Sequence, residues 1–381
     1  MRIEVSKQDL VQALDFVNST ASKDDESLTG HYLFRVAPST TDVIEILSTN
    51  NKAVSQARLN CKYTPTEGGV TAFMFSAPRL NQWLSAVPDA ALALEHAGGI
   101  TTAFSPRGEQ KYEAYDASKF PFFDDIREAS KPTAKVQATR LRAALQYARP
   151  FVHTDEVAKP QLCQIQFRNG LMYATDTSTA VAVQMVGFEE ADFSLSGKGI
   201  GGLLNFLGNC GDGEIEIREH ERMTLFCLGD MAMFAEAPLH QQFPKLALGL
   251  DNLNQRVWTL DREEIQGGLK YLLSAAPKGH IHLILNDDND EHTVQLGMAG
   301  ATGGTKYIPI SCVAKLVNND TTSLPAKGFK VNYTFLQRVL AAQANKEVQI
   351  GINVKGVGGW LRFDEVNSDG DSFHAIVQWS N

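Results

Sequence analysis

Apolar and polar residues alternate along short stretches of this chain, and at three places the alternation changes to a helical spacing of apolar residues. Alternation is typical of a half-buried strand, whereas apolar residues four apart lie on one face of a helix. The alternating stretches begin at Arg2, Lys135 and Val257, and the helical pairs that follow them are Leu10/Leu14, Leu141/Leu145 and Ile265/Leu269. Ser6, Thr139 and Asp261 precede these pairs and are predicted to be helix N-caps. We therefore expect one strand–helix opening to recur at intervals of roughly 125 residues.

A second helical pattern recurs midway through each third of the chain. Apolar residues at i, i+3 and i+4 coincide when residues 78–84, 198–204 and 334–340 are aligned. Each pattern is followed by a short alternating stretch, at residues 92–95, 214–217 and 348–352. The first two thirds then close on the same dipeptide, Phe120-Pro121 and Phe243-Pro244. Each third therefore reads as strand, helix, several strands, helix and several strands.

The predicted fold class is α+β, with three repeated domains. Hairpin signals at residues 287–290 and 368–371 join neighbouring strands, so nothing in the pattern requires a parallel sheet. We expect each domain to carry antiparallel sheet on one side and two helices on the other. The predicted domains are residues 1–127, 128–252 and 253–381.

Composition indicates an ordinary globular protein. Hydrophobic residues make up 43% of the 381 residues and charged residues 21%. No apolar run reaches the length of a membrane-spanning helix, and the N-terminal residues lack the apolar core of a signal peptide, so we expect a cytoplasmic protein. Five scattered cysteines without a CxxC pair argue against a disulfide framework and a structural zinc site and favour buried free thiols.

The charge is distributed unevenly. The net charge of −9 excludes a protein that simply coats nucleic acid, because such proteins are basic. The six predicted helices nevertheless sum to +4, which leaves −13 on the rest of the chain. A mildly positive helical surface on an acidic protein would attract phosphates to that surface alone.

The order of these features resembles the beta sliding clamp of bacterial DNA polymerase III. The resemblance covers the whole chain: three repeats, the opening strand and helix, the linker Phe120–Asp125, and the Tyr173-Ala174-Thr175-Asp176 stretch. It implies a head-to-tail homodimer of six domains, a ring that encircles duplex DNA and tethers a polymerase. It implies neither catalysis nor a metal or cofactor. Twelve helices about 9 Å apart would surround an opening of about 25 Å, which admits a duplex loosely.

For DNA, the resemblance and the charge pattern together indicate basic residues on the helices and one on a loop of the first domain. For any one of them, a solvated surface charge is the competing interpretation. The candidates are Lys23, Arg79, Arg140, Arg142, Arg149, Lys198 and Arg338.

The resemblance also implies a pocket between the second and third domains, in which polymerase and clamp loader insert short linear peptides. The chain departs from the family there, because Thr177, Ser178 and Thr179 replace the usual glycine and basic residues after Asp176. It also ends in Gln-Trp-Ser-Asn, so its peptide preference stays open. The predicted pocket residues are Leu162, Thr175, Thr177, Ser178, Thr179, Ala180, Pro244, Leu248, Val377 and Trp379.

Subunit contacts are predicted from the same resemblance. Tyr271, Leu272 and Leu273 end the first helix of the third domain and resemble an apolar segment that closes the ring. Tyr112 would lie on the opposing edge of the first domain. A role in the third domain's own core is the alternative for Leu272.

Two other classes compete with a clamp. One is a metal-dependent enzyme, for which His280 and His282 could lie on one strand face near Asp287 and Asp288. The glycine-rich residues 297–304 lack the Lys-Ser/Thr ending of a phosphate loop, and no GxSxG or HExxH motif occurs. The other class is a clamp-derived interaction module that forms no ring.

Overall fold

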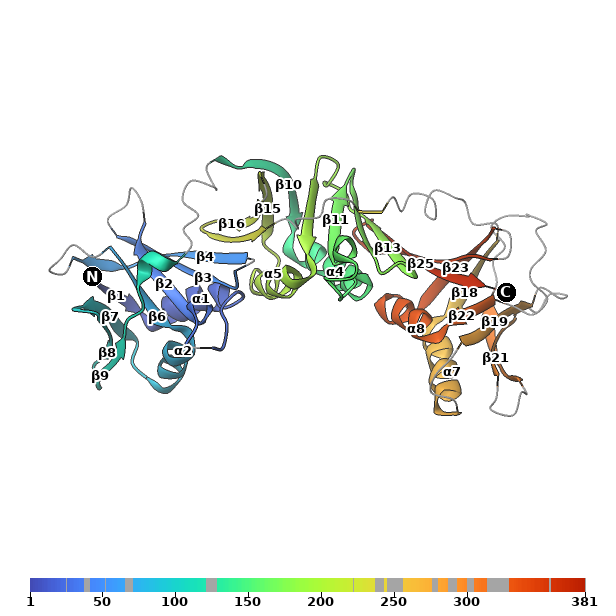
Figure 1. The fold of residues 1–381 in the computed structure, drawn as a ribbon, viewed down its shortest axis with the longest axis horizontal. Coiled ribbons are helices and arrows are strands. Elements are labelled where there is room, and N and C mark those ends of the chain that lie inside the picture. The colour runs from blue at the N-terminus through green and yellow to red at the C-terminus, as the bar shows by residue number, and fades with distance from the viewer. Residues whose placement is uncertain are drawn as a thin grey trace. The chain divides into compact units, whose positions relative to one another are not determined.

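The protein's structure, a computed structural model, divides the chain into two compact units. Unit 1 contains Met1–Arg142 and Lys198–Ala237, and unit 2 contains Ala143–Gly197 and Pro238–Asn381. The middle third of the chain therefore contributes to both units (Figure 1). The structure describes residues 1–24, 26–37, 42–51, 53–65, 71–120, 129–221, 223–236, 243–244, 256–275, 280–286, 293–299, 305–313, 329–355 and 358–380.

The first third lies wholly in unit 1 and holds two strand–helix openings, each followed by further strands. Its elements are β1 (Arg2–Ser6), α1 (Lys7–Val17), η1 (Leu28–Gly30), β2 (His31–Val36), β3 (Val43–Thr49), β4 (Ala53–Asn60), β5 (Lys62–Thr64), β6 (Ala72–Ser76), α2 (Ala77–Ala86), β7 (Ala91–Ala97), β8 (Ile100–Ser105), β9 (Gly108–Glu113) and η2 (Ala117–Lys119).

The middle third repeats this order. Its elements are β10 (Lys131–Gln137), α4 (Ala138–Ala148), η3 (Arg149–Phe151), η4 (Pro160–Leu162), β11 (Gln164–Arg168), β12 (Leu171–Thr175), β13 (Thr179–Gln184), β14 (Asp192–Ser196), α5 (Gly197–Asn209), β15 (Glu214–His220), β16 (Met223–Leu228) and β17 (Met231–Glu236).

The last third, in unit 2, repeats the order again. Its elements are β18 (Arg256–Asp261), α7 (Arg262–Ala275), β19 (His280–Asn286), β20 (Thr293–Ala299), β21 (Thr305–Val313), β22 (Phe329–Asn332), α8 (Tyr333–Ala342), β23 (Glu347–Lys355), β24 (Gly358–Val366) and β25 (Ser372–Ser380). The predicted second helices fall within α2, α5 and α8, so the α+β class and the internal repeat are confirmed.

Strand pairing follows the same rule in each third. The strand before the first helix pairs with the strand after the second helix, in β1–β7, β10–β15 and β18–β23. The strand after the first helix pairs with the strand before the second, in β2–β6, β11–β14 and β19–β22. All of these pairs are antiparallel, and so are β19–β20 and β24–β25, the strand pairs that flank the two predicted hairpin signals.

Two further pairings join consecutive thirds within each unit. In unit 1, β4 of the first third pairs with β17 of the middle third, and Ala53 lies opposite Ala235. In unit 2, β13 of the middle third pairs with β25 of the last third, and Thr179 lies opposite Val377. We call these the first and second junctions. In both, the third strand after a first helix meets the final strand of the next third.

Helix capping agrees with the sequence at two of three positions. The Ser6 hydroxyl accepts a hydrogen bond from Asp9 N at 3.1 Å, and Asp261 Oδ1 accepts one from Glu264 N at 3.0 Å. The predicted cap at Thr139 is wrong, because α4 already begins at Ala138. The ladder between β10 and β15 extends to Gln137, and Ala138 N donates to Gly213 O, so long-range backbone pairing reaches the first residue of the helix.

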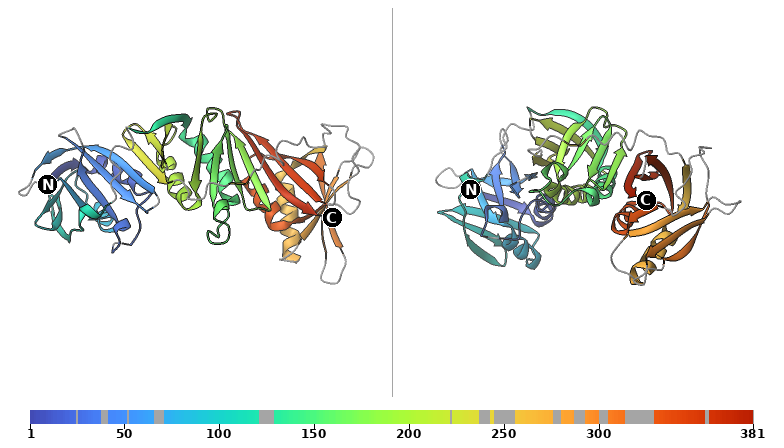
Figure 2. Two further views of the ribbon diagram at one scale, coloured as in Figure 1. Left: turned by 45° about the horizontal axis from the view of Figure 1, so that its top comes forward. Right: turned by 45° about the vertical axis from the view of Figure 1, so that its right-hand side comes forward.

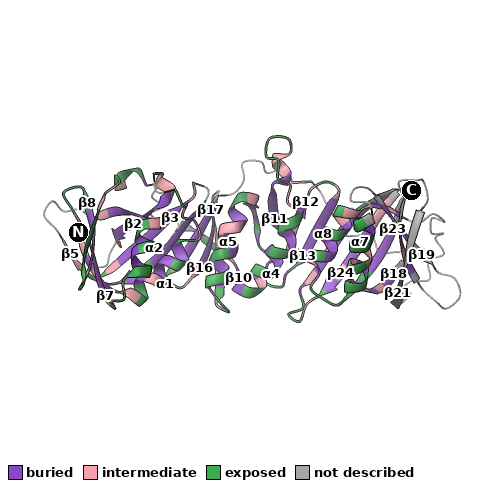
Figure 3. Cartoon of the chain, turned by 90° about the horizontal axis from the view of Figure 1, so that it is seen from below, coloured by how far each residue is buried: buried purple, intermediate pink, exposed green. Residues whose placement is uncertain are grey.

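The helices present one buried and one exposed face to their surroundings, as Figure 3 shows. The buried face of α1, with Leu10 and Leu14, belongs to the core of the first domain. A second core in unit 1 joins residues of β2–β4 to those of β16 and β17, and Phe120 from the closing Phe-Pro dipeptide is buried in it. The recurring dipeptide therefore contributes a core anchor at the first junction.

A cross-strand ladder of charges accompanies the first junction. Glu45 on β3 accepts from Arg35 Nε on β2 at 2.7 Å and from Arg58 Nε on β4 at 3.1 Å. The Glu45 side chain is only 2% exposed, whereas that of Arg58 is 38% exposed. Arg58 also lies 4.0 Å from Asp230, just before β17. Glu45 is therefore the buried centre of a charged network that extends to the junction.

Glu45→Ala should lower the free energy of unfolding by about 3–5 kcal/mol, because it breaks the buried ion pair between Glu45 and Arg35. Urea unfolding followed by tryptophan fluorescence measures the change. Arg58→Ala is the matched control and should remove about 1 kcal/mol or less, because its guanidinium is more exposed and the Arg35–Glu45 pair survives. Equal losses in both variants would contradict the buried ladder.

Candidate nucleic-acid and peptide interfaces

The basic candidates lie on helices and on one loop, as the sequence predicted. Three are on or directly after α4, in the order Arg140, Arg142 and Arg149. Arg142 and Arg149 are exposed and Arg140 is half-buried. The remaining exposed candidates are Lys23 after α1, Arg79 on α2 and Lys198 on α5. These positions allow contact with phosphates, and their role in binding DNA stays a prediction.

Arg338 on α8 has an internal partner, a carboxylate of the preceding third of the chain. Its Nη1 forms an ion pair with Asp176 Oδ2, and the two side chains are 27% and 13% exposed. The same nitrogen lies 3.4 Å from Thr179 Oγ1, and the guanidinium lies over the Phe335 ring at 5.6 Å. A phosphate contact by Arg338 would therefore compete with a carboxylate, which the sequence could not indicate.

Asp176 organises the turn between β12 and β13. Its Oδ1 accepts hydrogen bonds from Ser178 N at 3.0 Å, from Thr179 N at 2.8 Å and from the Thr179 hydroxyl at 2.9 Å. Thr177 in this turn has φ +84°, a left-handed conformation in which a β-branched residue is strained. The family's usual glycine at this position would adopt it freely. The sequence departure at Thr177 thus falls where the backbone favours glycine.

Several predicted pocket residues gather around this turn. The β13–β25 ladder sets Thr179 opposite Val377 and Ala180 opposite Ile376, and Gln378 N donates to Ser178 O. Lys159 Nζ reaches Thr177 Oγ1 at 3.3 Å, which brings the segment leading into η4 and Leu162 to the turn. Leu162, Thr175, Ala180 and Val377 are buried, whereas Thr177 is exposed. They could form the floor and the rim of one site.

The other pocket candidates are less defined. Pro244 is exposed, and no contact of its side chain is described. Trp379 lies in β25 with its backbone opposite Val331 and Gly359, but its side chain lies outside the described part of the structure. Leu248 also lies outside the described residues. The assignment of these residues to a peptide pocket stays a prediction.

The residues predicted to form subunit contacts differ in how far they are buried. Tyr112 on β9 is half-buried, and its ring centroid lies 4.9 Å from that of Phe75. Tyr271 on α7 is 66% exposed, a high value for a large aromatic side chain, and Leu273 is half-buried. Leu272 is 2% exposed and lies in the interior of its own unit. The helix continues to Ala275, so the three residues do not end it as predicted. Of the three, Tyr271 is the most suitable for an intermolecular contact.

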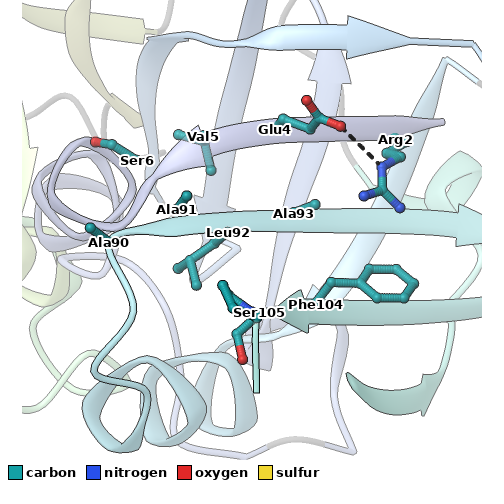
Figure 4. Close-up of a pocket in the computed structure, with 11 residues that line it drawn as sticks. Arg2, Glu4, Val5, Ser6, Ala90, Ala91, Leu92, Ala93, Phe104 and Ser105 are labelled. Carbon is teal, nitrogen blue, oxygen red and sulfur yellow. Dashed lines mark ion pairs between the residues drawn. The ribbon is translucent and has the colours of Figure 1, made fainter. Parts of the chain in front are cut away.

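Two grooves accompany these residues. In unit 2, a groove of about 390 Å³ lies between α4, α8 and the β24–β25 hairpin, and small alanine side chains line much of it. Arg338 is one of its lining residues. In unit 1, a groove lies over β1, β7 and β8 (Figure 4), where Arg2 forms an ion pair with Glu4 and stacks over Phe104. None of the site residues predicted from the sequence lines this second groove.

The enzyme alternative gains no support from the described residues. Within them, no three His, Cys, Asp or Glu side chains are close enough to hold a metal ion. His280 and His282 lie on β19, but Asp287 and Asp288 lie outside the described residues. Cys61, Cys163, Cys210 and Cys227 are buried free thiols as expected, and burial raises the pKa of Cys210 to about 12. No helix in the described ranges is long and apolar enough to cross a membrane.

The repeated helix pairs and antiparallel sheets define the class of fold, which is that of the bacterial sliding clamps. A scan against protein-family models gives no match, and a search of curated proteins gives none. Solved structures do match along the whole chain. The DNA polymerase III beta subunit of Thermotoga maritima is 17% identical with a TM-score of 0.79, over 100% of this chain and 99% of that one.

Other clamps match equally well. The beta subunit from DNA polymerase of Streptococcus pyogenes is 14% identical with a TM-score of 0.80, and the DNA polymerase sliding clamp of Caulobacter crescentus is 13% identical with a TM-score of 0.81. Both matches cover 100% of both chains. The fold implied by the sequence resemblance is therefore confirmed, and the low identity fits a divergent member.

Proposed function

We propose that this chain is a processivity factor: a homodimeric ring that encircles duplex DNA, slides on it and tethers a polymerase through a peptide site. The observation that carries the proposal is the repeated junction between thirds. Each junction pairs the third strand after a first helix with the final strand of the next third, in β4–β17 and β13–β25. Two strands in equivalent positions have no such partner among the described residues: β21, the third strand after the first helix of the last third, and β9, the final strand of the first third.

These two strands have the properties of such edges in the part of the chain that the structure describes. β9 pairs only with β8, and Glu109, Gln110 and Lys111 on it are exposed. β21 pairs with β20 and, at Cys312 and Val313 only, with β18. An open strand edge is a template for another strand. If β21 of one copy pairs with β9 of another, two such contacts close a head-to-tail dimer.

Binding to DNA would rest on charge and shape alone. The six predicted helices carry +4 in a chain whose net charge is −9, so phosphates are attracted to the helical surface and repelled elsewhere. Contacts to phosphates position a protein on the duplex without reading bases. Loose, sequence-independent attraction is what sliding requires. The rival proposal, a clamp-derived module without a ring, predicts a monomer that DNA topology does not affect.

Retention on DNA tests the ring. After loading, the protein should stay on a nicked circle and leave the same DNA after it is linearised, because a ring slides off free ends. Tyr271→Glu should yield folded monomers that the circle does not retain, because a charge would enter the proposed apolar contact. Val366→Glu, at another exposed apolar position of unit 2, is the control and should stay dimeric. A wild-type monomer in sedimentation would contradict the ring.

The salt dependence of DNA binding tests the basic surface. Replacing Arg140, Arg142 and Arg149 with alanine should flatten the slope of log affinity against log salt by about 0.9 for each phosphate that the protein no longer neutralises. The matched control replaces Lys62, Lys131 and Lys135, which are exposed and lie on strands β5 and β10, away from the proposed subunit contact. It makes the same change in net charge and should leave the slope nearly unchanged. Equal effects would mean that only net charge matters.

Truncation separates the floor of the peptide site from its rim. Leu162→Ala should weaken a fluorescent Gln-initiated peptide that contains leucine and phenylalanine by more than about 1 kcal/mol, because buried apolar contacts dominate such interfaces. Thr177→Ala should change the affinity little, because water can replace an exposed rim hydroxyl. Fluorescence anisotropy measures both, and thermal unfolding checks that each variant is folded. No saturable binding by the wild type would contradict the peptide site.

A further inference from the structure

The first and second junctions contain turns that share four hydrogen bonds. We call Thr49, Asn50, Asn51 and Ala53 the first turn and residues 175–179 the second turn. In each, the second residue donates its N–H to the carbonyl of the last, Asn50 to Ala53 at 3.2 Å and Asp176 to Thr179 at 3.2 Å. The Thr49 and Thr175 hydroxyls donate to the carbonyls of Ala53 and Thr179, at 3.0 and 2.7 Å. Two residues further on, the backbone N–H donates to the same hydroxyl: Asn51 N to Thr49 at 3.0 Å, and Thr177 N to Thr175 at 3.1 Å. Asn51 and Thr177 both have positive φ, +68° and +84°.

The two turns differ in charge. In the first turn the side chain that accepts from the last backbone N–H is Asn50, at 2.8 Å, and in the second it is Asp176, also at 2.8 Å. A neutral amide therefore suffices to form the turn. The negative charge of Asp176 has a different task, and its second oxygen is the atom that binds Arg338.

The arginine also belongs to the second junction alone. When the second helices are aligned as in the sequence repeat, Gly202 of α5 corresponds to Arg338 of α8. A Cβ on Gly202 would lie 3.0 Å from Ser19 O, so a side chain there would require the neighbouring backbone to move. The first junction thus has an equivalent turn and an equivalent helix without this ion pair. The pair of Asp176 and Arg338 is an additional feature of the second junction.

Arg338 is accessible from the side of the helices. It lines the groove between α4 and α8 together with Ala143, Ala341 and Ala342, and its side chain is 27% exposed. Glu365 lines the groove too, but it is buried and accepts hydrogen bonds from Ala344 N and Asn345 N, which compensate its charge. An anion that enters this groove would therefore meet the guanidinium as its partner.

We propose that Arg338 exchanges between Asp176 and a nucleic-acid phosphate, so that nucleic acid on the helices and peptide at the second turn weaken each other's binding. The inference rests on the proposed function and adds its regulation. When a phosphate takes Arg338, the Asp176 carboxylate stays mostly buried without its cation, which is unfavourable. The second turn loosens, and with it the rim of the peptide site. By linkage, a peptide that needs the ordered turn weakens nucleic-acid binding by the same factor.

Amide hydrogen exchange in the full-length protein, with and without a short random-sequence duplex, tests the coupling. Duplex should speed exchange in the second turn and leave the first turn unchanged, since the first turn shares four of these hydrogen bonds but has a neutral asparagine in place of Asp176. Asp176→Asn should keep the second turn protected, as Asn50 does in the first, and abolish the response to duplex. Arg338→Ala should loosen the second turn without duplex. Asp192→Asn, which breaks the exposed Arg168 pair, is the matched control and should behave as wild type.

Peptide titration gives the second measurement. Saturating duplex should weaken binding of the fluorescent peptide to the wild type by about five-fold or more and to Asp176→Asn hardly at all. Equal exchange in both turns, or an unchanged response in Asp176→Asn, would overturn the exchange of Arg338 while the clamp function stands. A protein that binds neither duplex nor peptide would overturn the proposed function, and the coupling with it.

Discussion

Backbone pairing between strand edges is the constraint on which the rest of this structure depends. An unpaired edge exposes a row of hydrogen-bonding groups, so a repeat protein must cover the edges of each unit. Here the final strand of one third covers an edge of the third before it, in β4–β17 and β13–β25 (Figure 2). The two sheets continue across the junctions for that reason. The helices, cores and turns of neighbouring repeats are held in register by these ladders.

The two junctions use the same backbone but different side chains. At the first, Phe120 is buried in a core shared by strands of both thirds, and Glu45 binds two arginines beside it. At the second, the charge lies in the turn itself, where Asp176 holds Arg338. A duplicated backbone can therefore keep one junction as fixed structure and allow the other to become a site. Thr177 is strained because it is a β-branched residue with a φ of +84°, a conformation that suits glycine better.

The sequence predicted what depends on local pattern. Apolar spacing located all six α-helices that the structure describes, and the whole-chain resemblance identified the fold. The cap at Thr139 was wrong because the long-range β10–β15 ladder runs to Gln137 and α4 begins directly after it, at Ala138. The pairing of Arg338 with Asp176 was missed because 162 positions separate the two residues and the charge alone suggested a phosphate contact. Tyr271 and Leu272 are adjacent in the sequence. Which of the two side chains is buried depends on how the helix is oriented in the fold, and the sequence does not specify that orientation.

Low identity is compatible with the proposed function for a physical reason. A ring that slides must not read bases, so its lining needs positive charge and a diameter but no particular side chain at a particular place. Its closure needs free strand edges, which are backbone features that many sequences provide. Identities of 13–17% with TM-scores near 0.8 are what such loose requirements permit. A peptide site, in contrast, depends on a few specific contacts. Divergence should therefore change partner choice before it changes the ring, and Thr177–Thr179, where this chain leaves the family pattern, belong to the proposed peptide site.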